Sequence, residues 1–197
     1  RHSVLKSKGG EQGGCGCRGN WAAHYLHGGP MADHFIQGSF AFTCSIAEAA
    51  LIEEAWQLAA DLMGDFKPVP LSDELLAVFL PTTANNPISG FTAIFDDMNF
   101  PDFGADIRVE SSTDDPMTCS VTIYSTIDFQ PWPIAALIQR CCQSSLAIAP
   151  VGFDWSFTCT KPNLDSFGGG WCAVFPDRIE IEFTREALSK ALEGGIS

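Results

Sequence analysis

Apolar and polar residues alternate with a period of two along much of the sequence, and this limits the folds it can form. The alternation is clearest at 36–44, 117–124, 153–159 and 179–183, where almost every second side chain is apolar. It is typical of β-strands that turn one face to a core and the other to water. Antiparallel sheets tolerate one solvated face, whereas parallel sheets are usually covered on both. The pattern therefore predicts an antiparallel sheet.

Two segments between these strands predict helices that would cover the dry face. Ser45 and Glu48 have the spacing of a capping box, in which the serine and glutamate side chains satisfy free N–H groups at a helix start. This helix should run to about Met63 and end at Gly64, and Pro131 is suited to the first turn of a second helix. Helices on one face of an antiparallel sheet make an α+β fold.

A recurrent segment predicts that the fold is duplicated. Residues 99–104 read Asn-Phe-Pro-Asp-Phe-Gly, and residues 163–168 read Asn-Leu-Asp-Ser-Phe-Gly. Each copy follows an apolar run, which starts at Phe91 in the first case and at Phe153 in the second. We therefore expect a strand at 91–95, matching the strand before the second copy.

The duplication predicts two related β-α-β-β halves, at about 34–115 and 116–184, followed by a C-terminal helix at 185–193. Phe103 and Phe167 would occupy equivalent buried positions at the turns between paired strands. The glycine after each would allow a backbone conformation that other residues resist. Each half alone is small for a stable core, so we expect them to share a sheet or to pack as a pair.

Residues 1–30 differ from the rest in composition, because they are rich in glycine and lack apolar periodicity. We expect a flexible or non-native extension, and a single α+β domain over 31–197. A single residue separates the two cysteines of the extension, whereas two to four residues usually separate those of structural zinc sites. No metal is therefore expected, and no cofactor is expected either. The soft ligands that make zinc an alternative are Cys15, Cys17, His24 and His27.

The chain is acidic, with a net charge of −13, and the charge is uneven. Residues 1–30 hold four of the 11 basic and one of the 24 acidic residues, so 31–197 retain 7 against 23, a net charge of −16. Such a field repels nucleic acid and anionic membranes, and it favours basic partners or serves solubility alone. We expect a protein partner with a basic surface, no direct nucleic-acid binding and no membrane contact.

Location follows from what the sequence lacks. No stretch approaches the roughly 20 apolar residues of a membrane helix, and the first residues lack the apolar centre of a secretory signal. Cys44, Cys119 and Cys159 fall on the apolar parity of their strands, as reduced core thiols would. A cytoplasmic location is expected.

Seven carboxylates within 20 residues form the candidate binding surface, here called the acidic segment. Arg108 is the only basic residue among them, so they would create a strongly negative surface if their loops folded to the same end of the sheet. Clustered oxygens also suit calcium or magnesium, but the glycine and glutamate of a calcium loop fall at the wrong offsets. The seven are Asp96, Asp97, Asp102, Asp106, Glu110, Asp114 and Asp115.

The sequence lacks the residues that several classes of enzyme use for catalysis. A nucleophilic cysteine needs a base, and His34 is the only histidine after residue 30. No Gly-x-Ser-x-Gly motif occurs. Residues 168–170 are three glycines without the Lys-Ser/Thr of a phosphate loop, and a tight turn is expected there.

Residues 153–170, from Phe-Asp-Trp-Ser-Phe to Phe-Gly-Gly-Gly, resemble a segment of small uncharacterised acidic proteins carried by bacterial phages and plasmids. The resemblance covers under a tenth of the chain and brings no catalytic residues. It implies an accessory protein of a mobile element, a group that includes acidic inhibitors of host defence complexes.

These observations favour a non-enzymatic acidic accessory protein that acts by protein binding. Its specific form would be a nucleic-acid mimic that inhibits a host defence or DNA-handling complex. Two alternatives stay open: a small metal-dependent hydrolase using the loop at 96–106, and a structural or oligomerisation module. A homodimer is compatible with each.

Overall fold

The first strand of the chain lies at the centre of a six-stranded antiparallel sheet. The computed structural model describes residues 33–64, 70–161 and 166–194. The strand order is β2-β3-β1-β4-β5-β6, so β1 pairs with β3 on one side and with β4 on the other. The predicted α+β fold with an antiparallel sheet is confirmed. The strands are β1 (His34–Ser45), β2 (Asp106–Ser111), β3 (Thr118–Ser125), β4 (Val151–Cys159), β5 (Gly168–Val174) and β6 (Ile179–Phe183).

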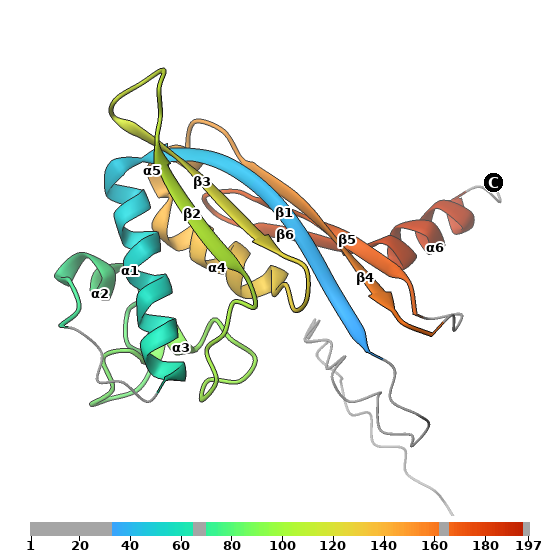
Figure 1. Cartoon of the computed structure of the whole chain (residues 1–197), viewed down its shortest axis with the longest axis horizontal. Helices are drawn as coiled ribbons and strands as arrows, with labels where there is room; N and C mark the ends of the chain where they lie inside the picture. The colour runs from blue at the N-terminus through green and yellow to red at the C-terminus, as the bar shows by residue number, and fades with distance from the viewer. Residues whose placement is uncertain (1–32, 65–69, 162–165, 195–197) are drawn as a thin grey trace, which may run out of the picture. The chain divides into compact units, whose positions relative to one another are not determined.

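Helices α1 and α4 cover the apolar face of the sheet, and α4 passes behind β2 and β3 in Figure 1. Side chains of alternate strand residues, such as Phe42 and Val121, are buried under them. The final helix, α6, lies beside β5 and β6 and has no buried residue. The helices are α1 (Ile46–Met63), α2 (Asp73–Val78), α3 (Ser89–Thr92), α4 (Pro131–Cys141), α5 (Gln143–Leu146) and α6 (Thr184–Gly194).

The predicted capping box at the start of α1 is confirmed. The Ser45 hydroxyl accepts a hydrogen bond from the Glu48 N–H, and the Glu48 carboxylate accepts one from the Ser45 N–H at 3.0 Å. The helix ends at Met63, with Gly64 as its C-cap.

The strand expected at 91–95 is wrong, because this segment forms α3 and the turns after it. Phe91, Ile94 and Phe95 are all buried, and spacings of three and four residues place them on one side of a helical turn. The Phe91 and Phe95 rings pack on Phe103, with centroid distances of 6.4 Å and 4.9 Å. A strand would have turned Ile94 away from its two neighbours.

The internal duplication is not confirmed. Phe103 is 2% exposed and stacks on Trp56, whereas Phe167 is 52% exposed. The segment before Phe103 is helical, but the corresponding segment before Phe167 is the strand β4. The recurrent sequence therefore occupies two different environments.

The three glycines at 168–170 begin β5 and do not form the expected tight turn. Aromatic rings of the neighbouring strand explain why side chains are missing there. A Cβ on Gly168 would lie 2.3 Å from the Phe157 ring, and one on Gly170 would lie 2.4 Å from the Trp155 indole. The glycines let β5 pass close to these two rings.

Candidate binding face

The acidic segment is spread along β2 and is not gathered at one end of the sheet. Asp106 and Glu110 lie on β2 itself. Asp96, Asp97 and Asp102 precede the strand, while Asp114 and Asp115 belong to the β2–β3 connection, which is at the other end of β2 in Figure 1. Six strand residues at roughly 3.3 Å each separate the two groups by about 20 Å. The seven residues as one binding surface stay a prediction.

Several of these carboxylates form turns. Asp97 accepts a hydrogen bond from the Asn99 N–H at 2.9 Å, and Asp102 accepts one from the Gly104 N–H at 2.8 Å. Asp115 does the same for the N–H of Met117 at 2.9 Å. Aspartate is common in turns for this reason.

On β2, the one basic residue of the segment is paired. The Arg108 guanidinium lies 2.7 Å from the Glu110 carboxylate, and both side chains are more than half exposed. Such a surface pair adds little stability and leaves Asp106 as the unbalanced charge of the strand.

A second acidic arrangement crosses the opposite half of the sheet, on the face that α1 and α4 leave open. Strand register places Asp154 of β4 opposite Trp171 of β5, and Trp171 opposite Glu182 of β6. The three side chains therefore form a line across adjacent strands, with Cβ atoms about 5 Å apart. We call Asp154, Trp171 and Glu182 the Trp171 row.

Trp171 is the informative member of this row, because its side chain points away from the core and is 40% exposed. Its strand neighbours Cys172 and Val174 are buried on the other face. Asp154 is exposed, and Glu182 accepts a hydrogen bond from the Lys190 ammonium of α6. The Glu182 carboxylate is thus already paired, and its side chain is 19% exposed. The indole face beside the exposed Asp154 carboxylate suits a lysine or arginine side chain, through charge pairing and cation–π attraction.

The alternation at 179–183 implies that Glu182 faces solvent, but the sequence does not single out Asp154 or Trp171. The available signal was Trp171 itself, on the polar parity of a strand whose other parity is Cys172 and Val174. The register that brings it beside Asp154 is not visible in the sequence.

Asp128 lies in a loop beside the first residues of β1 and is influenced by the charge of Asp102. Partial burial first, and then the nearby charge of Asp102, raise the pKa of Asp128, against a hydrogen bond from the Gln130 amide. The backbone of Asp128 also pairs with Ile36. Across residues 33–64, 70–161 and 166–194, no group of three or more His, Cys, Asp or Glu side chains is arranged to hold a metal ion.

Near the other end of β1, in the first turn of α1, the Glu48 carboxylate is buried. It accepts hydrogen bonds from the N–H groups of Ser45, Ser144 and Ser145, at 3.0, 2.8 and 3.0 Å, and from the hydroxyls of Ser45 and Ser145. Burial alone would raise the pKa of Glu48, but the bonds from Ser145 and Ser45 outweigh it and lower that pKa. The arrangement joins α1 to the α4–α5 junction and explains why the carboxylate is buried.

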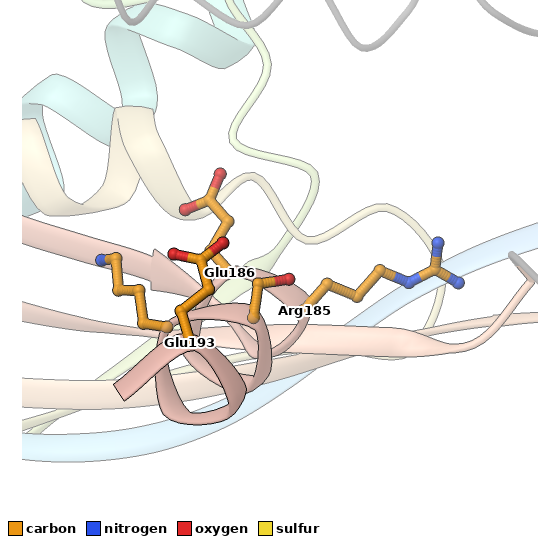
Figure 2. Close-up of a pocket in the computed structure, with 5 residues that line it drawn as sticks. Arg185, Glu186 and Glu193 are labelled. Atoms are coloured by element: carbon orange, nitrogen blue, oxygen red, sulfur yellow. The ribbon is translucent and has the colours of Figure 1, made fainter. Parts of the chain in front are cut away.

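A surface hollow runs along α6 and is lined by residues of this helix alone. Figure 2 shows Glu186 and Glu193 on one side of the helix, with Arg185 extending away from them. The candidate zinc ligands Cys15, Cys17, His24 and His27 lie outside the described residues.

In the described part of the chain, each helix is too short or too polar to cross a membrane. Comparison of the chain with protein-family models, with curated proteins and with solved structures found no match.

Proposed function

We propose that the protein binds another protein through the open face of its sheet, and that the Trp171 row receives a basic side chain of the partner. The observation that carries the proposal is the partly exposed Trp171 between the exposed Asp154 and Glu182, which already binds the Lys190 ammonium. Interface centres are enriched in tryptophan, which supplies a large contact area at low entropic cost.

The charge of the chain supports a basic partner. Residues 31–197 have a net charge of −16, which accelerates encounter with a positive surface and disfavours an acidic one. The pairing of Glu182 with Lys190 is an example within the chain of an ammonium bound at this edge of the sheet.

The specific form of the proposal is an inhibitor that occupies the basic, nucleic-acid-binding groove of a host defence or DNA-handling complex in the cytoplasm. Carboxylates on a sheet face would replace phosphates there. The acidic segment along β2 would then extend the contact beyond the Trp171 row.

Binding to short basic peptides tests the proposal. Oligolysine and oligoarginine peptides are titrated calorimetrically into the wild type, Trp171→Ala, and the double variant Asp154→Asn, Glu182→Gln. We expect saturable binding that weakens roughly tenfold in either variant and falls with salt, because screening reduces charge pairing. Trp132→Ala is the matched control, since Trp132 is an exposed tryptophan on α4, away from the row.

Equal binding by wild type and both Trp171-row variants would refute the role of the row. If neutralising the acidic segment abolished binding instead, the surface along β2 would be the binding site. Pull-down from host lysate at low and high salt would then identify the partner.

A homodimer stays a separate prediction. Sedimentation velocity of the full chain at several concentrations would detect it, and a monomer at every concentration would exclude it over that range.

A further inference from the structure

The strand β2 forms one edge of the sheet, and β3 is its only strand neighbour (Figure 1). Just after β2, the Ser112 N–H donates a backbone hydrogen bond to the Thr118 carbonyl at 3.0 Å. In an antiparallel pair, every second pair of facing residues exchanges such bonds. The register of β2 and β3 is unbroken, so steps of two back from Ser112 reach the residues whose backbone groups point toward β3. They are Asp106, Arg108 and Glu110.

The backbone groups of the alternate residues therefore point to the free edge of the sheet. Ile107 and Val109 are the central residues of this set. Within residues 33–64, 70–161 and 166–194, their N–H and C=O groups have no hydrogen-bond partner beyond the strand. A row of donors and acceptors of this kind can pair with an added strand.

Two features make β2 more suitable for pairing than β6, the strand at the other edge. Edge strands are often protected by a proline, by a bulge or by charged side chains that point inward. β2 contains none of these, and its inward side chains, Ile107 and Val109, pack against the core. β6, by contrast, is contacted by α6, whose Lys190 binds Glu182.

The solvent-facing side chains of β2 indicate the chemistry of a matching strand. Asp106 and Glu110 are exposed, and Arg108 lies 2.7 Å from the Glu110 carboxylate. The segments at both ends of β2 carry the other carboxylates of the acidic segment, so this edge is negative as a whole. Facing residues of neighbouring strands have Cβ atoms about 4.5–5.5 Å apart, and opposite charges at that distance stabilise the pair.

We propose that β2 binds an extended segment of a partner protein as an added antiparallel strand. Basic residues of the segment lie opposite Asp106 and Glu110, and apolar residues lie opposite Ile107 and Val109. The backbone bonds supply affinity and the side chains set the register.

This contact is distinct from the Trp171 row, because β3, β1 and β4 separate β2 from β5. A second copy of the chain fits less well, since each copy has a net charge of −16 over 31–197.

The test adds an acetylated peptide with the central sequence Lys-Val-Thr-Ile-Lys to the full chain labelled with nitrogen-15. Solvent exchange of the Ile107 and Val109 amides, measured by NMR, should slow about tenfold at a peptide concentration of about ten times Kd, because both N–H groups gain an acceptor. The Arg108 amide, which points toward β3, is the internal control and should change little.

N-methylation of the peptide separates strand addition from charge attraction. A methyl group on the valine nitrogen removes an N–H that would face β2, so binding should weaken roughly tenfold or more. The matched control has the methyl group on the threonine nitrogen, which would point away from β2, and should weaken binding less than about threefold. The two peptides have the same composition and the same charge.

Three results would overturn the proposal. The first is failure of the unmodified peptide to bind, and the second is equal affinity of the two methylated peptides. The third is protection of the Ile107 and Val109 amides without peptide that increases with protein concentration, which would identify a second copy of the chain as the added strand.

Discussion

A carboxylate lies near each end of β1, and the two differ in burial and in the number of hydrogen-bond donors that they receive. Glu48, at the end near Ser45, is buried and receives donors from three serines. Asp128, at the end near Ile36, stays exposed, has one amide donor and lies close to another aspartate. The number of donors, and not burial alone, decides whether a carboxylate prefers its charged form.

Replacement of Glu48 should cause the largest loss of unfolding free energy. Glu48→Ala leaves the N–H groups of Ser144 and Ser145 without their acceptor and opens the junction, which should cost about 3–5 kcal/mol of unfolding free energy. Urea denaturation measures it. Glu53→Gln, at an exposed position of the same helix, is the control and should change stability by less than about 0.5 kcal/mol. A cost below about 1 kcal/mol at Glu48 would contradict a stabilising role.

The next largest loss of stability is expected at Gly104, beside Asp128. This glycine has φ of +60°, and a Cβ there would lie 1.6 Å from the Asp128 carbonyl oxygen. Gly104→Ala should therefore cost at least about 2 kcal/mol, from strain and displacement of the loop. Gly152→Ala is the matched control, because its Cβ would lie 3.7 Å from the nearest atom. Similar stabilities for the two variants would show that the loop moves freely.

The pH dependence of stability should come from Glu48. Its folded pKa lies below the unfolded value, so its contribution is fully present above the unfolded pKa, about 4.3, and is lost as pH falls through the folded pKa. The stability difference between wild type and Glu48→Gln, measured by urea denaturation, should therefore shrink below about pH 4. A difference that stayed constant to pH 3 would be inconsistent with a lowered pKa.

Asp128 should show the smallest effect and the opposite sign. Its raised pKa means that ionisation costs stability above the folded pKa, and that this cost disappears below the unfolded one. Asp128→Asn should increase stability at pH 7 by a few tenths of a kcal/mol, since solvent screens the exposed group. Thermal unfolding at low salt detects it, and Asp102→Ala, which would lose the hydrogen bond from the Gly104 N–H, should not stabilise equally.

Local sequence patterns predicted most of the elements. The alternation at β1, β3, β4 and β6 and the cap at Ser45 depend on neighbouring residues only, and the structure has all of them. The strand expected at 91–95 depended on the match to the strand before the second copy. A short apolar run fits a helical turn equally well, and here Phe91 and Phe95 pack on Phe103 from such a turn.

The candidate site was harder to predict, because it depends on strand order. Asp154 and Glu182 are 28 residues apart, and only the register through Trp171 brings them into one row. Burial of Glu48 likewise depends on Ser144 and Ser145, nearly 100 residues later. The acidic composition suggested that carboxylates take part in binding, but it could not show which of them lie side by side in the fold.

The central position of β1 has a consequence for synthesis of the chain. It pairs with β3, and its first residues pair with the end of β4, where His34 faces Cys159. A ribosome makes a chain from the N-terminus, so β1 emerges well before both of its neighbours. During that interval its backbone has no sheet partner, although α1 can already form because its cap is local. One edge of β1 should therefore become paired once β3 has been released, and the other only after about residue 159.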